Sequence, residues 1–256
     1  MSVTLPDAEE GDGKGHIRKT WSLIARRGDG PYTPAIAVRA ACRDLGAVRI
    51  GAYPALGVVS LDQIKECFSD LNISTQITET RPIPPFKSVL GGRFEDLDDT
   101  VRKTHESVTP RTYVGQSTVT RGKGFQARIS AALFGFPATG ENISVSVSKT
   151  PTERGEVWVR QFGAAVFRSF LSPTKRGMSE RFGLFAFDLD LVVKEGTLCF
   201  PVKSGRFLGI PVPRALLPIS EAREYVEDEK FRFDVHLKSP TGATLVHYRG
   251  WLMKSE

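Results

Sequence analysis

Cysteine is scarce in this sequence. Cys42, Cys67 and Cys199 are the three cysteines of the 256-residue chain, and no two of them form a CxxC pair. A disulfide framework needs paired cysteines, and a zinc site needs closely spaced ligands. The pattern therefore argues against both, and it favours a reducing, cytoplasmic compartment.

Long apolar runs are also missing. No stretch reaches the ~18 consecutive apolar residues that predict a membrane-spanning helix. Residues 1–15 are acidic and rich in glycine, without the apolar segment of a secretory signal, and we expect them to form a disordered leader. Hydrophobic residues still make up 40% and charged residues 25% of the chain, which is typical of a globular protein with a core.

The positive charge is unevenly distributed. The formal net charge is +6; residues 1–110 carry −1 (14 basic and 15 acidic side chains) and residues 111–256 carry +7 (21 basic and 14 acidic). This excess suits an anionic ligand. The basic residues are scattered among acidic ones rather than gathered in a run, which argues against nucleic-acid binding.

A strand, a glycine turn and a helix pattern open the first region, residues 16–80. Trp21–Ala25 is predicted as the strand, and Gly28-Asp29-Gly30 as the turn. A dinucleotide fingerprint, G-x-G-x-x-G, would need a third glycine where Thr33 stands. Two neighbouring prolines also remove backbone amides that would bind phosphate. We therefore predict a structural turn and no cofactor site.

The rest of this region reads as a small α/β segment. Thr33 is predicted to cap the first helix, with Pro34 at its first position. Ser60 and Gln63 have the spacing of a capping box at the start of a second helix. Ile73–Thr78 alternates like a strand.

After a proline-rich linker, predicted at 81–88, the pattern becomes that of a β-rich domain, 89–256. A helix is expected near Asp98–Glu106, burying Leu97, Val101 and the stem of His105. From Thr112 the apolar period is two, interrupted by a helix at Phe125–Phe134. Strand-like runs follow "NISVSVS" and "GEVWVRQF" at Ala165–Leu171, Phe182–Val193, Thr197–Val202, Ala222–Glu227, Phe231–Leu237 and Thr244–Met253.

Short strands at hairpin spacing predict an α+β fold dominated by a curved antiparallel sheet or half-barrel with few helices. The last hairpin can be predicted residue by residue. A turn at Thr241-Gly242 places Val235 opposite Tyr248 and Leu237 opposite Val246 on an apolar face. The other face would pair Asp234 with Arg249, His236 with His247, and Arg232 with Trp251.

Catalytic and metal motifs are weak. "GQSTV" lacks the second glycine of a nucleophile elbow, and no histidine is placed to activate its serine. His236 and His247 could face each other, but a metal site would need Asp234 as a third ligand. We predict no catalytic residue and no metal site, and an exposed polar pair for the two histidines.

A set of ionisable residues on the predicted strands is the remaining candidate site. In a sheet that curls into a half-barrel, several of them would point inward and line a polar cavity. Buried charges must be paired, so the set would be a salt-bridge network or a ligand-binding site. Salt bridges and solvated faces are the alternative. The set comprises Arg121, Arg128, Glu156, Arg160, Glu180, Arg181, Glu224 and Tyr248.

Two resemblances rest on longer motifs. "LGGRFEDL", "VRKTH", "VTRGKGFQARISAALFGFP", "GEVWVRQFG", "LGIPVPRALLP" and "VHYRGWL" make residues 89–253 resemble the uncharacterised domain family DUF4166. "WSLIARRGDGPYTPAIAVRAA" and "GAYPALGVVSLDQI" make residues 21–80 resemble the C-terminal end of saccharopine-dehydrogenase-like reductases. The resemblance implies a reductase tail without its nucleotide-binding fold, followed by an accessory domain, and it implies no reaction.

Two functions are compatible with these patterns. The first is a non-catalytic domain that binds a small anionic or amphipathic molecule. The second is an accessory subunit or remnant of an NAD(P)-dependent reductase, with residues 16–80 docking on a separate chain. In that case the apolar side chains of this region should be exposed, namely Ile36, Val38, Leu61, Ile64 and Phe68.

Overall fold

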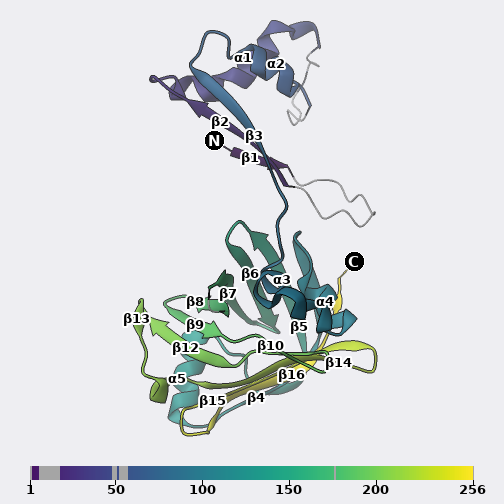
Figure 1. Cartoon of the computed structure of the whole chain (residues 1–256), viewed down its shortest axis with the longest axis vertical. Helices are drawn as coiled ribbons and strands as arrows, with labels where there is room; N and C mark the ends of the chain where they lie inside the picture. The colour runs from purple at the N-terminus through teal and green to yellow at the C-terminus, as the bar shows by residue number, and fades with distance from the viewer. Residues whose placement is uncertain (1, 6–17, 48–50, 52–56, 176, 256) are drawn as a thin grey trace. The chain divides into compact units, whose positions relative to one another are not determined.

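The structure is a computed structural model that describes residues 2–5, 18–47, 51, 57–175 and 177–255. The chain divides into two compact units, Met1–Pro82 and Ile83–Glu256, which Figure 1 shows. In the described part of the chain, no helix has the length and apolar composition needed to cross a membrane.

The first unit is a three-stranded antiparallel sheet with short helices. β2 (Arg18–Ala25) lies between β1 (Ser2–Leu5) and β3 (Ile73–Thr80). Between β2 and β3 the chain forms η1 (Gly30–Ala35), α1 (Ile36–Arg43), η2 (Leu45–Ala47) and α2 (Leu61–Glu66). The core of this unit is small and consists of Leu23, Ile36, Ala40, Cys67 and Phe68.

Two predictions for the first unit are wrong in detail. Ser2–Leu5, predicted as part of a disordered leader, pair with β2; residues 6–15 of the leader lie outside the described residues. Thr33 lies inside η1 and caps nothing, because the two nearby prolines, whose φ is fixed, start a 3-10 turn at Gly30. The capping box is confirmed: the Gln63 N–H donates to Ser60 Oγ, and the Ser60 N–H donates to Gln63 Oε1.

The second unit is one large antiparallel sheet, as predicted. Its strand order is β10-β11-β14-β15-β16-β4-β5-β6-β7-β8-β9-β12-β13. The bounds are β4 (Arg111–Arg121), β5 (Gly140–Thr152), β6 (Gly155–Phe162), β7 (Ala165–Thr174), β8 (Gly177–Phe182), β9 (Phe185–Leu189), β10 (Val192–Lys194), β11 (Thr197–Cys199), β12 (Val202–Phe207), β13 (Ile210–Pro211), β14 (Ile219–Glu227), β15 (Lys230–Lys238) and β16 (Thr244–Lys254). The helices are α3 (Pro85–Leu90), η3 (Gly91–Asp96), α4 (Asp99–His105), α5 (Phe125–Phe134) and η4 (Arg214–Leu216).

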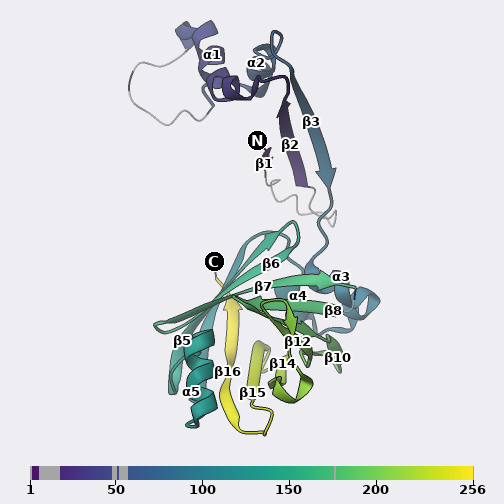
Figure 2. The same cartoon turned by 90° about the vertical axis from the view of Figure 1, so that its left-hand side faces the viewer.

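One bent hairpin connects the two ends of this strand order. β9 and β10 belong to one arm of it, and β11 and β12 to the other. Leu189 pairs with Val202, and Val192 pairs with Cys199 in the same register. Between them the Asp190 N–H donates to the Pro201 carbonyl. Because β9 also pairs with β8 and β11 with β14, the sheet curls around a single core (Figure 2).

The curvature depends on close backbone approach at two glycines. A Cβ on Gly115 of β4 would lie 1.9 Å from the Trp251 carbonyl oxygen of β16, and one on Gly250 would lie 2.1 Å from the Gln116 carbonyl oxygen. Real Cβ atoms do not approach backbone oxygens so closely. Glycine at these positions therefore lets β4 and β16 coil tightly against each other.

The predicted linker at 81–88 differs from the structure. α3 begins at Pro85, and Phe86 is completely buried in the core of the second unit. Burial of the apolar Phe86 ring stabilises this segment against the sheet, so it does not form a solvated linker. The predicted Phe182–Val193 strand is also interrupted, because a turn at Gly183 and Leu184 separates β8 from β9.

The predicted register of the last hairpin is confirmed. Val235 pairs with Tyr248, Asp234 with Arg249, and His236 with His247. The side chain of Asp234 nevertheless binds Arg223 and His247. Backbone register was predictable from the turn, whereas side-chain partners depend on β14, which lies on the other side of β15.

Candidate ligand cavity

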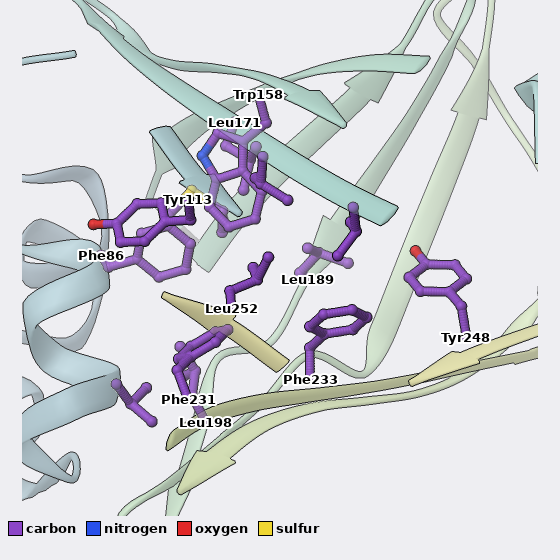
Figure 3. Close-up of a cluster of buried hydrophobic side chains, with 14 of the residues drawn as sticks. Phe86, Tyr113, Trp158, Leu171, Leu189, Leu198, Phe231, Phe233, Tyr248 and Leu252 are labelled. Carbon is purple, nitrogen blue, oxygen red and sulfur yellow. The ribbon is translucent and has the colours of Figure 1, made fainter. Parts of the chain in front are cut away.

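The curled sheet surrounds a partly open cavity of about 160 Å³. Its wall is mostly aromatic and aliphatic, and Figure 3 shows part of this interior, with Trp158 and Leu171 above and Phe231, Phe233 and Leu252 below. Rings gather at one end, where Phe134 of α5 contacts Phe182 and Phe187. The cavity is therefore an apolar chamber into which a few polar groups project.

Five of the eight predicted site residues lie in this interior. Arg160, Glu180, Glu224 and Tyr248 line the cavity, and Glu156 is buried beside it. The other three do not converge there. Arg121 donates to the Pro137 carbonyl, Arg128 is exposed on α5, and Arg181 is exposed and lies over Phe170.

Arg160 is held on the inner face of β6. Strand alternation places Glu156, Trp158 and Arg160 on this face. The Arg160 guanidinium donates to Ser169 Oγ at 2.7 Å and to Glu180 Oε1 at 2.9 Å. Its Cζ atom lies 4.6 Å from the centre of the Trp158 ring. The side chains of Arg160 and Glu180 remain 13% exposed, so this ion pair keeps a surface toward the cavity.

Glu156 orients the indole. The Trp158 Nε1–H donates to Glu156 Oε2 at 2.5 Å. Lys149 Nζ lies 4.2 Å from the centre of the same ring. The Arg160 guanidinium and the Lys149 amine thus both lie close to one indole ring in an apolar interior, where cation–π attraction is stronger than at an exposed site.

Lys149 belongs to the site but was not among the predicted residues. Its ammonium donates to the Thr104 carbonyl at 2.9 Å and lies 3.4 Å from His105 Nδ1. Burial lowers the pKa of Lys149, while the nearby Glu224 and Glu156 carboxyls act against that shift. A signal was present in the sequence: the inner face of β5 carries Val145 and Val147, and alternation continues it to Lys149.

His105 joins Lys149 to Glu224. The residue is 2% exposed and its ring lies 3.9 Å from the Phe86 ring, so the prediction of a half-packed histidine underestimated its burial. Burial first, and Lys149 second, lower the pKa of His105. The neutral ring donates from Nε2 to Glu224 Oε2 at 2.5 Å, and Nδ1 faces the Lys149 ammonium.

Glu224 is kept ionised by its neighbours. Burial alone would raise the pKa of this carboxyl, but His105, Lys149 and Arg160 outweigh it and the pKa is lowered. Tyr248 behaves as a neutral group, since burial raises its pKa to about 12. The cavity wall therefore offers cationic donors, anionic acceptors and a phenol hydroxyl.

The second polar cluster lies on the outer face of β15 and β16. The rings of His236 and His247 stack at 4.5 Å, as their predicted pairing requires. His247 Nε2 lies 2.8 Å from Asp234 Oδ1, and His236 Nε2 lies 2.9 Å from Thr244 Oγ1. Among the described residues, no three His, Cys, Asp or Glu side chains are placed to hold a metal ion.

Fold and cavity together define the second unit as a curved antiparallel-sheet domain with a partly polar internal chamber. Residues 97–252 match the family described as Domain of unknown function (DUF4166), and the chain belongs to that family. The reductase resemblance of residues 21–80 finds no support among these matches.

No curated protein matches this chain. Among solved structures, the chain is similar to a protein with unknown function from the DUF3598 family of Nostoc punctiforme PCC 73102, with 10% identity and a TM-score of 0.34. That match covers 100% of this chain and 66% of the other, so the chain spans less than two thirds of that protein.

Proposed function

We propose that the second unit binds one small amphipathic molecule in its internal cavity without transforming it. The observation that carries this proposal is an apolar chamber with a short polar wall. Well-packed domains leave few voids larger than a water molecule, and a void lined by rings next to ionised groups is the usual form of a small-molecule site.

The cavity volume limits the size of the ligand. A cavity of about 150 Å³ lined by apolar side chains accommodates benzene. At about 160 Å³, the chamber suits a single aromatic ring or a short aliphatic chain with one polar group. Larger molecules would need the rings at the Phe134 end to move.

The polar wall favours an amphipathic ligand over a strongly charged one. Arg160 is paired with Glu180, and Glu224 is bonded to His105. An extra full charge would have to compete with these pairs in a medium where unpaired charge is costly. A hydroxyl or a carbonyl could instead bond to the faces of these groups that remain open to the cavity.

A binding role also fits the chemistry of the wall. The imidazole of His105 is engaged by Lys149 and Glu224 rather than by a hydroxyl or thiol. Activation of a nucleophile would need such a contact. Within the described residues the cluster orients the cavity wall, and nothing in its geometry points to bond breaking.

The proposal can be tested through Trp158. Changing Trp21 and Trp251 to Phe leaves Trp158 as the remaining tryptophan of three, and its fluorescence reports on the cavity. We expect benzyl alcohol to quench it with roughly tenfold higher affinity than toluene, the value of one added hydrogen bond. Equal affinity for toluene, or no quenching by any of these probes, would contradict the proposal.

Two alanine-to-leucine variants, one inside the cavity and one on the surface, control for nonspecific binding. Ala222 lines the cavity, whereas Ala164 is exposed in the turn between β6 and β7. Ala222→Leu should abolish quenching by the probes, and Ala164→Leu should leave it unchanged.

Docking of the first unit on a reductase chain is the alternative, and the structure gives it partial support. Val38 and Leu61 are exposed as that alternative requires. Ile36 and Phe68 are buried in the core of their own unit, and Ile64 packs against that core. These three side chains therefore need no partner to explain them.

A further inference from the structure

We propose that an exposed apolar rim beside the cavity docks on the surface of an anionic lipid bilayer. The rim consists of Leu133, Leu184, Phe207, Leu208 and Ile210. This inference rests on the proposed function only for what docking would achieve, namely exchange of an amphipathic ligand with the bilayer. The surface itself is defined independently of the cavity contents.

Three chain segments meet at the rim. Phe134, next to Leu133, lies 5.0 Å from the Phe185 ring, which lies 4.7 Å from the Phe207 ring. The Leu208 N–H donates to the Leu184 carbonyl at 3.0 Å. The members of the rim are 39–69% exposed, and these contacts bring their three segments together at one part of the surface.

Helix α5 extends this surface. Phe125, Ile129 and Leu133 are spaced four residues apart and therefore lie along one side of the helix, and all three are exposed. Ala127 and Ala131 are the buried side chains of α5. A surface helix ordinarily turns its large apolar residues toward the core, so this reversed arrangement indicates that the exposed side of α5 has a partner.

The turn that carries Leu208 departs from ordinary turn chemistry. Leu208 and Gly209 connect β12 and β13 with φ values of 51° and 83°. Positive φ at both positions is the geometry in which Asn-Gly is favoured, and a branched side chain is disfavoured at such a φ. An exposed leucine at this position therefore works against local stability, which is expected where a side chain serves binding.

Charge identifies the partner. Segments 121–137, 181–187 and 203–217 supply the rim and α5. They contain seven Arg and Lys and no Asp or Glu, although the whole chain has 29 acidic residues. Asp188, directly after the second segment, pairs with Arg206, and the other six basic side chains leave the rim and α5 with a net positive charge. Apolar side chains in such a setting match the interface of a bilayer that contains anionic lipids. Leu184 and Leu208 lie at turn tips, which suits insertion between headgroups.

The rim adjoins the aromatic end of the cavity. Phe134 and Phe187 line the cavity, and the ring of Phe185 lies 6.4 Å from that of Phe187. A bilayer on the rim would therefore lie next to the ring-lined end of the chamber. An amphipathic ligand could then pass between bilayer and cavity without crossing bulk water.

The test is co-sedimentation of the full chain with vesicles. One set is phosphatidylcholine alone, and the other contains about 30% phosphatidylserine. We expect binding to the anionic vesicles at least tenfold tighter than to the neutral ones, decreasing as salt is raised. No binding to either set, or equal binding to both, would overturn the proposal.

Leu208→Asn separates docking from folding. Asparagine tolerates positive φ, so we expect an unchanged or higher thermal midpoint together with at least fivefold weaker binding to the anionic vesicles. Met253→Asn is the matched control: Met253 is 59% exposed against 61% for Leu208, but lies at the far end of β16. Met253→Asn should bind anionic vesicles like the wild type. An equal loss of vesicle binding in both variants would contradict a specific role for the rim.

The Trp158 quenching assay keeps this proposal distinct from the proposed function. A chain that binds benzyl alcohol but no vesicles refutes only the docking surface. A chain that binds vesicles through Leu208 but quenches with no probe refutes only the cavity function.

Discussion

The two units of this chain treat charge in opposite ways. In the first unit the core is five small or apolar side chains, and its ion pairs, such as Arg39 with Asp70, are on the surface. In the second unit Lys149, His105, Glu156 and Glu224 are buried within a much larger core. Buried charge is costly unless paired and bonded, so these four side chains depend on one another's contacts for their place in the core.

The largest expected loss of stability comes from a glycine substitution in the coiled sheet of the second unit, compared with one in a turn of the first unit. Gly115→Ala places a Cβ against a β16 carbonyl oxygen, and we expect about 4 kcal/mol or more of destabilisation of the second unit. Gly30→Ala in the first unit meets no atom within 4 Å and should change stability by less than about 1 kcal/mol. Chemical denaturation of both variants measures the difference. Similar losses would show that the sheet tolerates relaxation at Gly115.

The inner ion pair comes next. Arg160→Ala leaves the carboxylate of Glu180, which is only 13% exposed, without its partner, and we expect a loss of about 3 kcal/mol. Arg181 lies one residue further along β8 but is exposed, and Arg181→Ala should cost less than about 0.5 kcal/mol. Urea denaturation separates the two. A small loss of stability in Arg160→Ala, together with abolished probe binding, would instead show that the ion pair contributes more to ligand binding than to folding.

The tryptophans give a similar contrast at lower magnitude. Trp158 is buried between cations, and Trp158→Ala should cost about 3 kcal/mol or more. Trp251 is half-buried opposite Arg232 with Lys230 near its ring, and Trp251→Ala should cost about 1 kcal/mol. Thermal denaturation of the two variants tests whether the outer face of the last hairpin is the wetter one. Equal costs would place Trp251 in the core.

The smallest effect is a pH dependence confined to the second unit. The pKa of His105 is lowered by burial, so its contribution to stability is complete above about pH 6.5 and is lost as the pH falls below that value, where the unfolded state gains the proton. Glu224, whose pKa is lowered, adds a loss in the same direction at lower pH.

His105→Gln should therefore flatten the stability of the second unit between about pH 6.5 and 5. The pKa of His236 is also lowered by partial burial, and His236→Gln is the control for its smaller contribution. An unchanged profile in His105→Gln would mean that His105 titrates alike in both states. The described residues of the first unit contain no histidine and should show no response in this window.

Much of the second unit could be predicted because its causes are local. Alternation identified the inner face of β6, and the turn at Gly242 fixed the register of the last hairpin. His105 and Glu224 could not be paired from the sequence, because they are 119 positions apart and meet only when α4 packs beside β14. The prediction of a linker at 81–88 was wrong for the same reason, because Phe86 is buried by strands that lie far along the chain.

Three predicted site residues were misplaced by the same lack of three-dimensional information. Arginine is a residue type expected in a polar cavity wall, which is why Arg121, Arg128 and Arg181 were included. The sheet turns Arg181 outward, however, and the helix turns Arg128 to solvent. Lys149 was missed although alternation placed it on the inner face of β5, because a lysine among serines is ordinarily a solvated one.

The most direct test of the cavity function is native mass spectrometry of the full chain taken straight from cell lysate. The proposal predicts a wild-type mass that includes one small molecule, and a bare mass for Ala222→Leu, whose leucine fills the space. A bare wild-type chain would contradict it, as would a molecule that Ala222→Leu retains in the same proportion.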